Sequence, residues 1–161
     1  MAVIDLSTAG IRFGYAIETT AGTKPSTFTN VPHPKEIPDM NNEPNALDTS
    51  HLNIPAGGFK TYTEGLKDTG GSIAITIGMS ASLLSAWNTM VAAAKTALES
   101  NKETWFVLYH PGLTDSFFFT GIPSELNFPS AAVDEVWDAT VYIVPTDIKG
   151  WDTAVNPTDP S

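Results

Sequence analysis

Alternating apolar and polar positions predict a series of β-strands along the chain. The clearest is residues 72–79, SIAITIGM, where isoleucine or methionine occupies every second position. The final predicted strand should end at Pro145, because proline has no N–H to give to a sheet ladder. The predicted strands cover, in chain order, residues 11–18, 35–40, 72–79, 103–110, 116–122 and 135–144.

Apolar residues at a spacing of three and four predict one amphipathic helix, at about residues 82–99. Ser80 or Ser82 is a suitable N-cap, and Ser100-Asn101 ends the pattern. The elements together predict a mainly β fold of two packed antiparallel sheets, sandwich-like or barrel-like, with one flanking helix. We expect a single domain over 1–161, with an N-terminal arm at 1–10 and a polar C-terminal tail at 146–161, mobile except near Trp151.

Residues 41–71 form the longest stretch without a clear pattern. The stretch holds two prolines, five glycines and mostly polar side chains, and loops of this length are usually functional or disordered. The glycine pairs 57–58 and 70–71 are expected to supply turns that let the loop leave the body and return into the strand at 72–79. Apolar residues that would serve no purpose in a solvated linker suggest that it docks on a partner: Leu47, Leu52, Ile54, Phe59, Tyr62 and Leu66.

The composition excludes some functions. Charged residues make up only 16% of the chain, and the formal net charge is −10. Arg12 is the only arginine, so the chain lacks the cationic side chains that bind a phosphate backbone tightly. There is no cysteine for a thiolate site or a disulfide. No apolar run approaches the ~18 residues of a membrane-spanning helix, so we expect no membrane insertion.

Motifs for catalysis or metal binding are weak. The glycine-rich segment 65–71, GLKDTGG, leads into a strand, whereas a phosphate-binding loop follows a strand and opens a helix. His33, His51 and His110 lack metal-ligand spacing. We therefore expect no catalytic residue, no metal and no cofactor.

Neighbouring side chains could still form two kinds of site. The acidic residues Asp134, Glu135 and Asp138 are more typical of a solvated strand entry than of a catalytic pair. Trp87, Trp105 and Trp137 are expected in the core, with a stacking platform for sugars or bases as the alternative. Trp151 could anchor on a partner.

Three segments carry a resemblance to a known family. They are residues 46–52, ALDTSHL; residues 54–77, IPAGGFKTYTEGLKDTGGSIAITI; and residues 121–145, GIPSELNFPSAAVDEVWDATVYIVP. Their order along the chain and their residue patterns resemble those of the major tail (tail tube) proteins of long-tailed, non-contractile bacteriophages. The resemblance covers most of residues 10–148.

This resemblance implies a structural virion protein rather than an enzyme. Six copies would form a ring, and rings would stack into a tube that conducts DNA into the host without binding it specifically. The loop 41–71 would contact neighbouring subunits and rings. Implied partners are the tape-measure protein, the tail terminator and the tail-tip or initiator proteins, with assembly in the host cytoplasm.

Carboxylates facing the lumen of such a tube would repel the DNA phosphates. Asp138 is the first candidate and Glu18 the second, because both lie opposite an apolar strand face. An outward position or an intersubunit salt bridge is the alternative for both. The alternative function is a β-sandwich module that binds carbohydrate or a cell surface, and a small hydrolase is the third.

Overall fold

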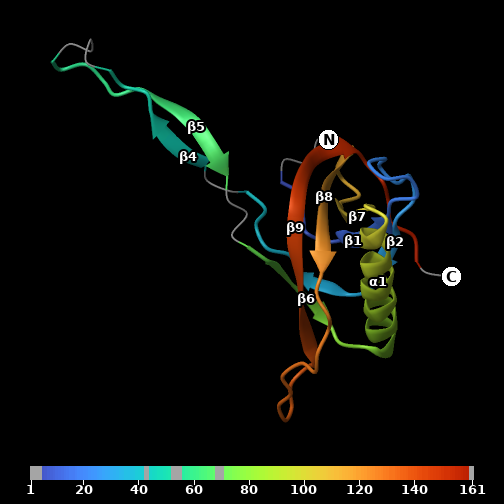
Figure 1. The fold of residues 1–161 in the computed structure, drawn as a ribbon. Coiled ribbons are helices and arrows are strands. Elements are labelled where there is room, and N and C mark those ends of the chain that lie inside the picture. Colours follow the sequence, from blue (N-terminus) through green and yellow to red (C-terminus); the bar gives the residue numbers. More distant parts are fainter. Residues whose placement is uncertain (1–4, 42–43, 52–55, 68–70, 160–161) are drawn as a thin grey trace. The chain divides into compact units, whose positions relative to one another are not determined.

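The computed structural model describes residues 5–41, 44–51, 56–67 and 71–159, apart from the side chains of 66 and 67. The chain divides into two compact units (Figure 1). Met1–Pro38 and Ser72–Ser161 form the first unit, called the body. Asp39–Gly71 form the second, called the hairpin unit. The second unit coincides closely with the predicted loop 41–71.

The body is built on one seven-stranded antiparallel sheet with barrel-like curvature (Figure 1). Its strand order is β2-β1-β7-β8-β9-β6-β3, so β2 and β3 are the two edges. The mainly β fold with one helix is therefore confirmed. The strands are β1 Arg12–Ile17, β2 Thr29–Val31, β3 Pro34–Glu36, β6 Ile73–Gly78, β7 Thr104–Tyr109, β8 Asp115–Pro123 and β9 Asp138–Thr153.

The helix α1, Ala81–Glu99, follows the predicted range and has well-formed ends. The Ser80 side chain accepts a hydrogen bond from the Leu83 amide at 3.1 Å, which satisfies one of the free N–H groups of the first turn. At the other end Asn101 adopts a left-handed conformation with φ 57°. The Lys102 amide then donates to the Ala97 carbonyl at 2.9 Å, which closes a Schellman motif.

The main core lies between α1 and the sheet. Trp87 is fully buried, and its indole N–H donates to the Ser124 carbonyl at 2.8 Å. On the sheet, Phe13, Phe106 and Phe119 form a stacked row across β1, β7 and β8, with ring centroids 5.7 and 5.2 Å apart. A second cluster contains Ala16, Phe28, Trp105, Val107 and Phe118, with Val155 packed against it.

Strand β9 corrects the prediction that the last strand ends at Pro145. It runs for 16 residues, and Pro145 lies inside it opposite Gly121 of β8. The pairing register shifts between Thr120 and Gly121. Such a bulge leaves positions without ladder hydrogen bonds, which is where a sheet tolerates proline. Residues 146–153 of the predicted tail are therefore strand.

The hairpin unit corrects the prediction that residues 41–71 lack secondary structure. It contains a two-stranded antiparallel sheet, β4 Pro44–Asp48 and β5 Tyr62–Lys67. Gly57 and Gly71 have φ values of 89° and 86°, which confirms the predicted turns at these two positions. The sequence did not predict this sheet because none of the described side chains of either strand is buried, so no alternation of buried and exposed positions arises.

Candidate assembly surfaces

The hairpin unit holds itself together by backbone pairing and short polar contacts. Next to the β4–β5 ladder, the Thr49 amide donates to the Thr61 carbonyl at 2.8 Å, and the two hydroxyl groups lie 2.9 Å apart. The Thr61 amide donates to the Ser50 hydroxyl at 3.0 Å. Asp48 accepts from the Ser50 amide at 2.8 Å, and this bond lowers the pKa of Asp48. All of these contacts lie at the surface.

None of the described residues of the hairpin unit is buried. Phe59 is 91% exposed, and Leu47 and Tyr62 are exposed by more than half. A two-stranded hairpin is marginally stable by itself in water. The predicted docking residues Leu52 and Ile54 lie outside the described residues, as does the side chain of Leu66. The described part of the unit thus presents large apolar side chains that are more than half exposed.

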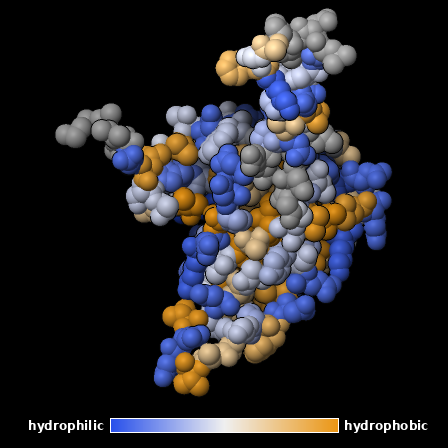
Figure 2. Space-filling model, turned by 90° about the vertical axis from the view of Figure 1, so that its left-hand side faces the viewer, coloured by the Kyte–Doolittle hydropathy of each residue, from blue (hydrophilic) through white to orange (hydrophobic). Residues whose placement is uncertain are grey.

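The body has an apolar groove of about 520 Å³ beside the N-terminus of α1. Leu84 on the helix and Phe128 and Trp137 on the β8–β9 loop are all exposed at this groove, Phe128 by 83%. The Phe128 and Trp137 rings pack with centroids 5.2 Å apart. Hydrophobic side chains are visible at the lower end of Figure 2, the end where this loop lies in Figure 1. Val133 and Val136 of the same loop are also exposed.

Of the four tryptophans, Trp137 is the one whose position differs from the expectation. The buried positions of Trp87 and Trp105 are confirmed. Trp137 is not a core residue, because β9 begins only at Asp138 and the indole lies in the groove. Trp151 is 62% exposed and meets Phe117 edge-on, with centroids 5.6 Å apart. Two of the four indoles are therefore available to a partner.

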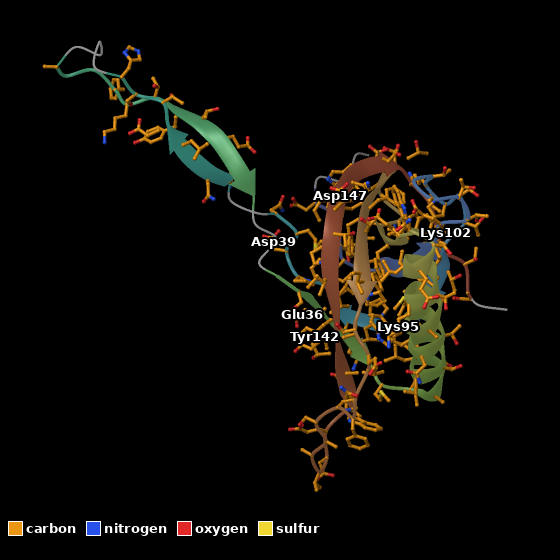
Figure 3. The ribbon with its side chains drawn as sticks, in the orientation of Figure 1. Glu36, Asp39, Lys95, Lys102, Tyr142 and Asp147 are labelled. Carbon is orange, nitrogen blue, oxygen red and sulfur yellow. The ribbon has the colours of Figure 1, made fainter. Side chains whose placement is uncertain are left out.

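The face of β9 that points away from the helix is only partly covered. Asp138, Thr140, Tyr142 and Val144 alternate with the buried residues of the core. Figure 3 shows Tyr142 and Glu36 on this side of the sheet, opposite Lys95 and Lys102 on the helix side. This face is a second candidate surface of the body.

Asp138 lies on the outward face of β9, but its charge is paired with that of Lys35. Its carboxylate accepts from the Lys35 ammonium at 2.7 Å, and both side chains are partly exposed. Partly exposed ion pairs contribute little to stability, but this one offsets the negative charge at that point. The assignment of Asp138 to a lumen stays a prediction.

Glu18 is not a candidate for the lumen, because it is only 3% exposed. Its carboxylate accepts hydrogen bonds from the Glu103 amide at 2.8 Å, the Trp105 indole at 3.0 Å and the Gly22 amide at 3.2 Å. Burial alone would raise the pKa of Glu18, but these three hydrogen bonds and the nearby charge of Lys149 lower it. Glu103 and Trp105 are more than eighty residues from Glu18 along the chain, so this role could not be predicted from the sequence.

The lowered pKa of Glu18 leads to a prediction about how the free energy of unfolding depends on pH. Because the folded-state pKa is lowered, the stabilisation is complete above the ordinary pKa of a glutamate and is lost as pH falls through the folded-state value. Glu18→Gln leaves one of the three donors without an acceptor, so we expect a loss of about 1–3 kcal/mol at pH 7. The difference from the wild type should shrink as the pH falls below about 4.

Urea unfolding at several pH values measures this effect. The control is Glu36→Gln, which changes an exposed carboxylate on β3 and should leave the profile unchanged. An equal loss of stability on acidification in the wild type and in Glu18→Gln would contradict the role assigned to Glu18.

The structure brings together no group of three or more metal-ligating side chains among the residues that it describes. His110 is used locally: its Nε2 lies 2.6 Å from the Ser7 carbonyl and its Nδ1 accepts from the Gly112 amide at 2.8 Å. Asp134 has a left-handed conformation with φ 60° in the exposed β8–β9 loop. Within the described ranges, no helix is long and apolar enough to span a membrane.

Comparison with known proteins finds a likeness among solved structures. No family model matches the chain, and no curated protein matches it significantly. Among solved structures, the fold resembles a chain in the sixfold-symmetrised cryo-electron microscopy structure of the anti-feeding prophage baseplate. The TM-score is 0.53 at 11% sequence identity, and the match covers 92% of this chain and 96% of the other. At this identity the likeness concerns the fold.

Proposed function

We propose that the protein is a structural subunit of a phage tail, and specifically its tail tube protein. Six copies form a ring, and rings stack into a tube through which DNA passes into the host. The observation that carries the proposal is the fold, which corresponds over nearly its whole length to a chain of a sixfold-symmetrised prophage baseplate. The resemblance of three sequence segments to tail tube proteins points independently in the same direction.

The hairpin unit is the arm that links subunits in this proposal. It buries none of its described side chains, yet it carries Leu47, Phe59 and Tyr62. Burying a large apolar side chain contributes about 1.5–3 kcal/mol. Contact with a neighbouring copy would therefore stabilise both the interface and a hairpin that is marginal by itself.

Surfaces of the body would supply the remaining contacts. The groove at Leu84, Phe128 and Trp137 is apolar enough to be covered in an assembly. The partly covered face of β9 adds the exposed side chains of Tyr142 and Val144. A low content of charged residues, 16%, suits a surface that is mostly covered by neighbours. The net charge of −10 suits a conduit, since an acidic wall discourages binding of DNA phosphates.

The partners and the location follow from the proposed role. Rings would contact one another, the tape-measure protein inside the tube, and the terminator and tip or initiator proteins at its ends. The protein would reside in the virion tail after assembly in the host cytoplasm. It would act without catalysis and without a cofactor.

Native mass spectrometry and light scattering test the stoichiometry. We expect purified protein at high concentration, or with its tape-measure and initiator partners, to form species in multiples of six. A closed sixfold ring needs one heterologous interface repeated around the axis, so intermediate species should be sparse. Monomer alone in the presence of those partners would contradict the proposal.

A further inference from the structure

The segment of residues 154–159 occupies one edge of the body sheet. Thr158 forms a parallel bridge with Thr29 of the edge strand β2. The Asn30 amide donates to the Thr158 carbonyl at 2.7 Å, and the Thr158 amide donates to the Phe28 carbonyl at 3.0 Å. These are the backbone groups with which β2 would pair to any further strand.

Four side-chain contacts hold this segment in place. Arg12, the only arginine, donates to the Pro157 carbonyl at 3.1 Å. Pro157 is buried where Gly14 leaves room for it, since a Cβ on Gly14 would lie 2.7 Å from the Pro157 Cβ. Val155 packs on the second core cluster, and the Asn30 side chain donates to Asp159 at 3.0 Å.

The sequence of β2 already limits pairing at this edge. The strand is only three residues long, and Pro32, two residues after Asn30, has no N–H to donate. Short strands and prolines are devices that protect sheet edges from unwanted pairing. The 154–159 segment covers two further backbone groups of this edge, the Phe28 carbonyl and the Asn30 amide.

We propose that residues 154–159 are a removable edge cap, which prevents β2 from pairing with β-structure of a second copy of this chain. The capped subunit is the unassembled form. Displacing the cap exposes the edge of β2, which can then pair with a strand of another copy. The position of the cap would therefore determine whether two copies associate. This cap would operate in any assembly of the protein and does not depend on the tail tube role.

The variant Thr158→Pro removes the N–H that donates to Phe28 and leaves the rest of the segment in place. Thr158→Ala is the matched control, because it keeps the backbone N–H. Hydrogen exchange of the Asn30 amide, followed by NMR, reports whether the edge is covered. We expect exchange about five- to tenfold faster in Thr158→Pro than in the control, the factor of one net backbone hydrogen bond.

Analytical ultracentrifugation of the same proteins measures self-association. We expect Thr158→Pro to associate at a concentration about five- to tenfold lower than the wild type or Thr158→Ala. A synthetic peptide with the sequence of residues 154–159, AVNPTD, should return the variant to monomer and slow Asn30 exchange. Arg12→Ala, which weakens the cap from the other side, should change both measurements in the same direction.

Unchanged Asn30 exchange in Thr158→Pro would overturn the proposal, as would faster exchange with no gain in association. If the wild type forms sixfold rings and Thr158→Pro behaves identically, the cap fails while the tail tube role stands. If Thr158→Pro associates through β2 and the wild type never forms rings, the cap stands while the tail tube role fails.

Discussion

Replacing residues 39–71 by a short Gly-Ser linker is expected to abolish ring and tube formation while the body remains folded. The body should tolerate the change because β3 and β6 are antiparallel neighbours, with Pro34 opposite Ile77 and Glu36 opposite Thr76. A short turn can therefore join them. The hairpin unit is a separate compact unit, so its loss removes no part of the body core.

The expected effect on assembly is large. Burial of Leu47, Phe59 and Tyr62 against a neighbour would contribute about 1.5–3 kcal/mol for each side chain. Each 1.4 kcal/mol is a tenfold change in an association constant, so we expect the threshold concentration for assembly to rise by at least about 100-fold. Light scattering measures the threshold, and thermal unfolding checks the body.

A matched pair of point variants separates side-chain docking from the mere presence of the hairpin. Phe59→Ser removes the most exposed aromatic side chain of the unit, and Lys60→Ser changes its exposed neighbour. Assembly should weaken in Phe59→Ser and persist in Lys60→Ser. Normal tubes from the deletion variant would show that the hairpin unit is not the linking arm.

Trp87→Ala is expected to cause the largest loss of stability of any single substitution in the body. The side chain is fully buried between α1 and the sheet, and its indole N–H is bonded to the Ser124 carbonyl. Truncating a buried tryptophan costs about 3–5 kcal/mol, a large share of the ~5–15 kcal/mol that stabilises a typical domain. For a chain of this size the melting temperature should fall by about 10 °C.

The control is Trp151→Ala, because Trp151 is mostly exposed and touches one aromatic ring at the surface. This change should cost about 1 kcal/mol or less. Trp87→Phe keeps most of the packing and loses the hydrogen bond, so it should fall between the two. Calorimetry gives the three values, and equal losses in Trp87→Ala and Trp151→Ala would refute the assignment of the main core to α1 and the sheet.

Elements with a buried face could be predicted from the sequence. The three- and four-residue spacing around Trp87 located α1, and the alternation in 72–79 located β6, because each element buries one face in the core. The hairpin unit has no buried face among its described residues, so its strands left no periodic signal. That its apolar side chains dock on a partner stays a prediction.

Features that depend on distant partners could not be predicted. The three donors to Glu18 come from Gly22, Glu103 and Trp105, two of them more than eighty residues away along the chain. The bridge between Thr158 and β2 is made by backbone groups, which carry no sequence signature. The sequence wrongly predicted a strand end at Pro145. The bulge that accommodates this proline depends on the pairing register with β8, which the sequence does not show.

Electron microscopy of the purified protein tests the central claim most directly. The proposed tail tube role predicts rings with sixfold symmetry and an open central channel, and stacks of these rings when tape-measure and initiator proteins are present. Class averages should show the sixfold repeat without imposed symmetry. Featureless monomers under all of these conditions, or closed assemblies without a channel, would contradict it.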